Sequence, residues 1–394
     1  MKKEVRLSSE IFSEVVSEMK AEKMEGTKTG IVDWFENPYY LGIRLVPEYF
    51  YPNQIRIVKS FYGEDLNKDD IAWLELLKSE NKTNWKPGEE YDTLLIIAGQ
   101  RWGKSYLIAG MSLREVKDWI EPEDPWTDIP RQRGKPPIAK GAPVEIKEVA
   151  TSKENARDHV FNETQQFVEM SPYFKRKFNI DKQSKRMEIE FPHNLRLMAG
   201  ASSGKSIRGG TNLAVGFDEI CHQIGTKSQV GGEEIWKAMR NTTVTLGGKR
   251  FIISSPLTRD DQGMVLLDQA MSGESRGTLA FHLSSFEVCP WLRTDKDILK
   301  IMDTDPEGKS ELYSKDTYAL QVPVDFAIAK AENIISARDD LVNTLNELQT
   351  EILSMKFVEF ENKYRGTDEK SSLVIKITYE FSDEEIDLPP TDEE

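Results

Sequence analysis

The middle of the chain alternates between short apolar runs and longer segments whose apolar residues have helical spacing. Three apolar runs, 93–99, 213–217 and 251–255, have the length of buried strands, and further strands are predicted at 144–150 and 281–284. Between these strands, the segments 105–119 and 152–170 have helical spacing. Because strands that alternate with helices are joined by crossovers, the pattern predicts an α/β protein with a mainly parallel central sheet flanked by helices.

Other segments depart from this alternation. The sequence predicts a helix at 9–23, a short helix at 71–77, an irregular proline-rich stretch at 120–143, and a hairpin of 187–191 with 195–198. After about residue 330 the chain becomes acidic. We therefore expect three parts, which are an N-terminal helical extension (1–48), a main domain (49–330), and a small acidic C-terminal appendage with a partly disordered tail (331–394).

The composition favours a protein with a hydrophobic core. Hydrophobic residues make up 38% of the 394 positions, and no apolar run approaches the roughly 18 residues that cross a bilayer. With no apolar signal segment and only Cys221 and Cys289, we expect a cytoplasmic protein without a disulfide framework or a zinc site. The net charge is −15, of which residues 331–394 contribute −11. Basic patches therefore remain available on the rest of the chain.

The phosphate-binding pattern G-x-x-x-x-G-K-[ST] occurs twice, each time with Ala at its first position. The first copy, AGQRWGKS at Ala98–Ser105, follows a buried strand and begins a long helix. The second, AGASSGKS at Ala199–Ser206, follows a polar hairpin and leads into Gly209 and Gly210, which prevent a helix there. Only the first copy offers a helix N-terminus to an anion, so we expect ATP phosphates at Ala98–Ser105 and a flexible loop at the second copy.

Two adjacent acids end another predicted strand. Asp218 and Glu219 follow the apolar run LAVGF, 114 positions after Lys104. A carboxylate at a strand end can bind Mg²⁺ directly or through water, and a neighbouring carboxylate can activate the attacking water. We expect these roles for Asp218 and Glu219 respectively.

Two weaker signals accompany these motifs. Ser254 and Ser255 end the run FIISS, where hydroxyl groups beside the phosphate site can sense the γ-phosphate and transmit its loss. Gln54, within YPNQIRIVKSFY, carries a side-chain amide that can read an adenine edge. For Ser254 and Ser255 the alternative is a plain strand end, and for Gln54 it is a solvated position on a helix.

These four elements, in this order, resemble the ATPase domain of tailed-phage terminase large subunits, the motors that package DNA. The resemblance covers roughly Phe50–Phe326 and includes the segments VATSKENARDHVFNE and MEIEFPHNLRLMAG. It implies a P-loop NTPase fold of the ASCE (additional-strand, RecA-like) type. The implied nucleotide-binding residues are Gln54, Gly99, Gln100, Arg101, Trp102, Gly103, Lys104, Ser105 and Ser255. The implied catalytic residues are Glu219, Lys104 and Arg101, and the implied Mg²⁺ ligands are Ser105 and Asp218.

The resemblance also implies partners. ATP and Mg²⁺ are the expected cofactors, and the expected partners are double-stranded DNA, a homo-oligomeric ring of this chain, a portal protein and a small terminase subunit. Such rings take an arginine finger from a neighbouring subunit, for which Arg157 and Arg208 are candidates. Only 64 residues follow Lys330, too few for the family's C-terminal nuclease. DNA cutting by this chain is therefore not expected, and the chain would be either the motor half of a split enzyme or the partner of a separate endonuclease.

Two basic segments are candidates for sequence-independent DNA contacts. One contains Arg131, Arg133, Lys135 and Lys140, and the other spans 175–186; a solvated charged face explains each equally well. Two other functions remain open for the chain. A helicase or repair ATPase would need a second RecA-like domain, and a non-hydrolysing scaffold would not need an intact Lys104, Asp218 and Glu219.

Overall fold

The computed structural model describes residues 29–43, 52–99, 102–152, 155–177, 187–201, 209–223, 231–257 and 261–290. The chain divides into two units, Met1–Ala329 and Lys330–Glu394, and all of the described residues belong to the first. The predicted N-terminal helix at 9–23 and the acidic appendage at 331–394 lie outside the described residues. No helix in the described part of the chain is both long and apolar enough to cross a membrane.

The centre of the unit is a seven-stranded sheet with the order β3-β4-β2-β5-β6-β1-β7. The strands are β1 Thr93–Ala98, β2 Val144–Ala150, β3 Glu188–Phe191, β4 Leu195–Ala201, β5 Thr211–Asp218, β6 Lys249–Ser254 and β7 Thr278–Leu283. Every pairing is parallel except the β3–β4 hairpin. The predicted strands, the hairpin and the mainly parallel sheet are therefore confirmed.

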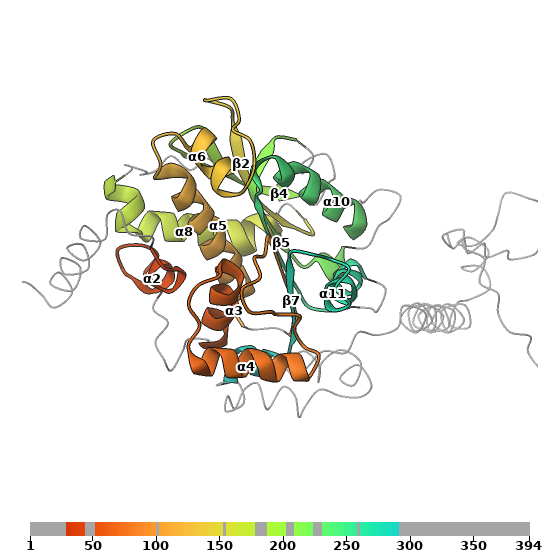
Figure 1. Ribbon diagram of the computed structural model, residues 1–394. Helices are drawn as coiled ribbons and strands as arrows, with labels where there is room; N and C mark the ends of the chain where they lie inside the picture. The colour runs from red at the N-terminus through yellow and green to blue at the C-terminus, as the bar shows by residue number, and fades with distance from the viewer. Residues whose placement is uncertain are drawn as a thin grey trace, which may run out of the picture. The chain divides into compact units, whose positions relative to one another are not determined.

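Helices cover both faces of this sheet (Figure 1). The α-helices are α2 Ile31–Glu36, α3 Pro52–Tyr62, α4 Lys68–Ser79, α5 Lys104–Ile120, α6 Pro125–Gln132, α8 Asn162–Met170, α10 Gly232–Thr243, α11 Gln262–Met271 and α12 Ser285–Val288. Two π-helical turns, η1 Ala156–Phe161 and η2 Tyr173–Lys177, flank α8, and two 3₁₀ turns are η3 Ile220–His222 and η4 Val244–Leu246. In Figure 1, α5 and α8 lie on one side of the strands and α10 and α11 on the other.

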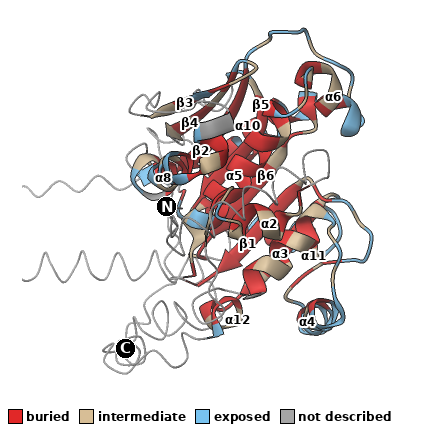
Figure 2. Cartoon of the chain, turned by 90° about the vertical axis from the view of Figure 1, so that its left-hand side faces the viewer, coloured by how far each residue is buried: buried red, intermediate tan, exposed pale blue. Residues whose placement is uncertain are grey.

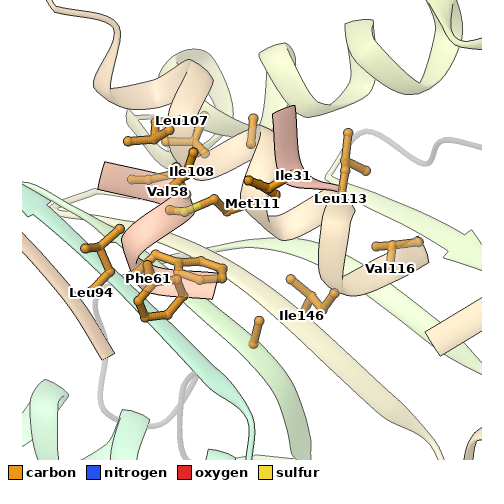
Figure 3. Close-up of a cluster of buried hydrophobic side chains, with 14 of the residues drawn as sticks. Ile31, Val58, Phe61, Leu94, Leu107, Ile108, Met111, Leu113, Val116 and Ile146 are labelled. Atoms are coloured by element: carbon orange, nitrogen blue, oxygen red, sulfur yellow. The ribbon is translucent and has the colours of Figure 1, made fainter. Parts of the chain in front are cut away.

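The core has two parts because successive side chains of a strand point to opposite faces. Along β1, Leu94 and Ile96 pack with α3 and α5, whereas Leu95 and Ile97 pack with α10 and α11. The central strands and α5 are accordingly buried along most of their length (Figure 2). Figure 3 shows the first part of the core, where side chains of α3 and α5 meet the sheet. The labelled residues there include Val58, Phe61, Leu94, Ile108, Met111 and Ile146.

Glycine allows α5 to approach the sheet closely. A Cβ atom at Gly216 of β5 would lie 2.5 Å from Cγ2 of Ile108 in α5, well inside van der Waals contact, so a larger residue would push the helix away. Gly216 lies two residues before Asp218. The glycine therefore helps to fix the distance between α5 and the carboxyl end of β5.

The proline-rich stretch 120–143 was expected to be irregular, and this expectation is wrong for α6. Pro125 occupies the first turn of that helix, where a missing N–H group costs no hydrogen bond. Trp126 and Ile129 are buried on its inner face, so packing outweighs the unfavourable Pro130 within the helix. The predicted helix at 152–170 is also interrupted, because its first turns form the wider helix η1 before α8 begins.

Candidate functional site

Three neighbouring strands end at one edge of the sheet. β6 lies between β5 and β1, and all three are parallel. Asp218 pairs with Ile253, and Ile253 pairs with Ile96, so the segments that follow these strands leave the sheet side by side. The sequence placed its candidate phosphate, acid and hydroxyl residues after these three strands. The topology therefore brings the predicted site residues to one edge.

The loop after β1 leads directly into the N-terminus of α5. Gly103 has a left-handed backbone conformation (φ 80°), which glycine adopts without strain, and α5 begins at Lys104. Trp102 is fully buried and donates its ring N–H to the carbonyl oxygen of Gly99 at 2.9 Å. The free N–H groups of the first helical turn and the helix dipole favour an anion at this end. Gln100 and Arg101 lie outside the described residues.

Gln54 contacts this loop from α3. Its side-chain amide donates to the carbonyl oxygen of Trp102, and Gln54 is buried. Asn53, its neighbour, donates to the carbonyl oxygen of Glu287 at the end of α12. The first turn of α3 is therefore hydrogen-bonded both to the loop between β1 and α5 and to the segment that follows β7. The structure gives Gln54 a role in holding the loop, a role the sequence did not suggest.

Lys104 and Glu219 form an ion pair at the carboxyl edge of the sheet. The Lys104 ammonium group donates to Oε1 of Glu219, although the two residues are 115 positions apart. Glu219 has a left-handed backbone (φ 65°, ψ 51°), which is uncommon for a residue other than glycine, and its N–H donates to Ile253 O at 2.9 Å. Strained residues of this kind are concentrated at functional sites. The turn after β5 therefore aims the Glu219 carboxylate at the start of α5.

The second carboxylate oxygen of Glu219 is bound by the end of β6. Oε2 accepts hydrogen bonds from Ser254 Oγ at 3.1 Å, from Ser255 N at 2.8 Å and from Ser255 Oγ at 2.9 Å. Burial by itself would raise the pKa of Glu219, but the charges of Lys104 and His222 and the hydrogen bond from the Ser255 N–H outweigh it and lower the pKa. Glu219 is therefore a carboxylate at neutral pH, with each oxygen held by a different partner.

His222 also belongs to this group, and the sequence did not single it out. Its Nε2 lies 3.2 Å from Ser255 Oγ and 3.6 Å from Oε2 of Glu219. The η3 turn brings it there, three positions after Glu219, and Ser254 Oγ accepts the N–H of Cys221 at 3.0 Å. The only signal in the sequence is a histidine shortly after the two acids, a spacing common enough to pass unnoticed.

The oxygens available to a divalent cation are few. Asp218 is 7% exposed at the end of β5, and Ser105 lies in the first turn of α5. Within the part of the chain that is described, no group of three or more His, Cys, Asp or Glu side chains is arranged to hold a metal ion. A carboxylate with a hydroxyl group suits Mg²⁺, which takes few protein ligands and completes its shell with phosphate oxygens and water. The donor set therefore fits Mg²⁺ bound together with a nucleotide.

The remaining candidates differ in their surroundings. Arg157 lies in η1, beyond the carboxyl end of β2, and pairs with Asp158 through two contacts of 2.5 and 2.9 Å. Arg208 lies outside the described residues.

Arg133, expected to face solvent or DNA, instead pairs with buried Glu115 at 2.5 Å. Arg131 and Lys140 are exposed, and they precede β2, at the opposite edge of the sheet from Lys104.

A family model described as "Uncharacterized protein MJ0330, N-terminal P-loop domain" matches residues 4–314. The chain belongs to this family. The match includes every described residue and so covers both the loop before α5 and the strand order around it. The MJ0330 N-terminal P-loop family and the observed sheet, with β6 inserted between β1 and β5, confirm the predicted P-loop fold of the additional-strand type.

Several solved structures are similar at low identity. The large terminase of bacteriophage HK97 is 15% identical over 68% of this chain and 54% of its own, with a TM-score of 0.44. The large terminase ATPase domain of Thermus phage P74-26 is 14% identical over 62% of this chain and 95% of its own, with a TM-score of 0.39. This chain spans about half the length of the HK97 protein. A search of curated proteins found no match.

Proposed function

We propose that this protein hydrolyses ATP and uses the energy to translocate double-stranded DNA, as the motor subunit that fills a viral procapsid. The contact between Lys104 and Glu219 carries the hydrolytic part of the proposal, because it joins the phosphate-binding loop to the acid that can activate water. The order of motifs, which resembles that of terminase large subunits, supports the DNA-packaging part.

The start of α5 binds the phosphates. In the structure the Lys104 ammonium is bound to Glu219. The β- and γ-phosphates of ATP carry more negative charge than one carboxylate, so Lys104 exchanges Glu219 for them when the nucleotide binds. The N–H groups of the first turn of α5 bind the same oxygens, and Gln54 keeps the loop in place through Trp102 O.

The exchange frees one oxygen of Glu219 for catalysis. Oε2 remains bound to Ser254 and Ser255, so Oε1, released by Lys104, is oriented towards the start of α5, where it accepts a proton from the attacking water. Asp218 and Ser105 would hold Mg²⁺, which would supply positive charge next to the γ-phosphate. Ser254 is the last residue of β6 and Ser255 begins the segment after it. Both bind Glu219, so they transmit phosphate loss to that segment.

The proposal also includes assembly with neighbouring copies of the chain and with partner proteins. An arginine finger from a neighbouring copy would complete the site. Arg157 lies beyond the carboxyl end of β2, on the same edge as Lys104, and its present partner is the exposed Asp158. A homo-oligomeric ring, a portal protein, a small terminase subunit and a separate nuclease are the partners that the terminase resemblance implies.

A triplex-displacement assay tests the DNA part. A third strand is annealed to a long duplex, and its release is followed with ATP, with a non-hydrolysable analogue, and with the Lys104→Ala variant. A duplex translocase releases the third strand only with ATP and wild-type protein and leaves the duplex intact. Separation of the duplex strands would instead support a helicase, and no release despite ATP hydrolysis would contradict translocation.

A further inference from the structure

The hydrogen-bond chain from His222 through Ser255 to Glu219 has a single internally consistent arrangement of protons. Both oxygens of Glu219 act as acceptors, since Oε1 is bound by the Lys104 ammonium group and Oε2 by the Ser255 N–H. Ser255 has one hydroxyl proton, and it donates that proton to Oε2 of Glu219 at 2.9 Å. The hydroxyl oxygen must then be the acceptor in the 3.2 Å contact with His222, whose Nε2 therefore carries a proton.

We propose that His222 is a positioning residue for the hydrolysis reaction. By donating its Nε2–H to Ser255, it turns the Ser255 hydroxyl towards Glu219 and fixes Oε2 of the carboxylate. The other oxygen is thereby kept facing the start of α5, where Lys104 now binds it. This inference rests on the proposed ATPase function, because a fixed Oε2 matters only if Oε1 activates water.

The surroundings make His222 suited to this role. The backbone of the η3 turn is fixed by hydrogen bonds from Cys221 N to Ser254 Oγ at 3.0 Å and from His222 N to Glu219 O at 3.1 Å. The imidazole side chain itself is 39% exposed. Truncating it therefore removes the contact with Ser255 and leaves no cavity in the core, and the effect on catalysis can be separated from an effect on folding.

The first test measures the proton directly and does not depend on hydrolysis. The full chain is labelled with ¹⁵N-histidine, which gives signals from four residues, and the His222→Gln variant identifies the His222 signals. We expect a protonated Nε2 whose shift changes in Ser255→Ala and not in Ser272→Ala, a substitution of an exposed serine after α11. A bare Nε2 nitrogen in the wild type would overturn the inference.

The second test separates positioning from structure. In His222→Ala we expect kcat for ATP to fall about five- to tenfold, the loss of roughly one hydrogen bond, while the Kd of a non-hydrolysable Mg·ATP analogue stays within about twofold. In His222→Gln the amide N–H replaces Nε2–H, so more than half of the activity should return. Equal impairment of the two variants, or wild-type activity in His222→Ala, would overturn the inference alone. An absence of hydrolysis by the wild type would overturn the proposed function and this inference with it.

Discussion

The ammonium group of Lys104 binds Oε1 of Glu219 across the carboxyl edge of the sheet. Under the proposed function, the nucleotide competes with the protein's own carboxylate for Lys104. Substituting Glu219→Gln removes the negative charge and leaves a side chain of the same shape. We expect the affinity for Mg·ATP to increase about three- to tenfold, while hydrolysis falls at least about a hundredfold because the base is lost.

Equilibrium titration with a fluorescent ATP analogue measures the first effect, and phosphate release measures the second. Glu233→Gln is the matched control, since it removes a carboxylate from an exposed position of α10. This control should change neither quantity. Weaker nucleotide binding in Glu219→Gln would show that the contact with Lys104 does not compete with the phosphates.

Gln54 should matter for nucleotide binding through the loop that it holds. Its amide donates to Trp102 O, so Gln54→Ala leaves a buried carbonyl oxygen without that donor and loosens the loop before α5. We expect the Kd for ATP and for GTP to rise by a similar factor, about tenfold. Gln132→Ala, at an exposed position, serves as the control. A loss confined to ATP would instead support the adenine-reading role expected from the sequence.

Glu148 gives the stability of the domain a specific pH dependence. It lies fully buried on β2, and burial raises its pKa from 4.5 to about 7, against the opposing hydrogen bond from Thr164 Oγ1 at 2.6 Å. Between those pH values the unfolded chain releases a proton that the folded protein keeps. The free energy of unfolding should therefore decrease as pH rises from about 4.5 to 7, by about 3 kcal/mol, and show no further contribution from Glu148 above that range.

Denaturant unfolding of Glu148→Gln and of the wild type across pH 5 to 8 measures this contribution. The variant lacks the titrating group, so its stability relative to the wild type should increase with pH through this window. Glu169→Gln, which changes an exposed carboxylate on α8, should follow the wild type at every pH. A constant difference between Glu148→Gln and the wild type would contradict the prediction.

Substituting Arg133 should lower the free energy of unfolding, whereas substituting Arg131 should hardly change it. Arg133 pairs with Glu115, whose side chain is 1% exposed, so Arg133→Ala leaves a buried carboxylate that keeps the hydroxyl of Tyr62 but loses its closest ion-pair partner. We expect a loss of about 3 kcal/mol in the free energy of unfolding, against less than about 0.5 kcal/mol for Arg131→Ala. Thermal or urea unfolding provides the measurement. Equal effects would mean that the Glu115 pair contributes nothing specific.

Strands β1, β5 and β6 could be predicted from the sequence because they are buried on both faces and contain continuous apolar runs. The loop before α5 was also predictable, since its glycine and lysine follow one such run and precede a helix. Helix α6 was missed because proline was taken as a sign of irregular structure, although Pro125 stands where a helix tolerates it. Local pattern alone does not reveal that Trp126 and Ile129 are buried.

The side-chain contacts of the site were less predictable for a physical reason. Gln54 and Trp102 are distant in the chain, and they meet because α3 packs in the same part of the core as α5. His222 and Ser255 are also distant, and they meet because β5 and β6 are neighbours in the sheet. The contact of Arg133 was unpredictable for the same reason. In the sequence it is one of several basic residues, and only the fold shows that it reaches Glu115.

ATP hydrolysis by the wild type and by Glu219→Ala tests the central claim most directly. It is measured with and without long double-stranded DNA, over protein concentrations that promote assembly. The expected result is hydrolysis that rises more than linearly with protein concentration, is stimulated by DNA, and is abolished in Glu219→Ala. Undiminished hydrolysis in Glu219→Ala, or a wild type that binds Mg·ATP without hydrolysing it under any of these conditions, would contradict it.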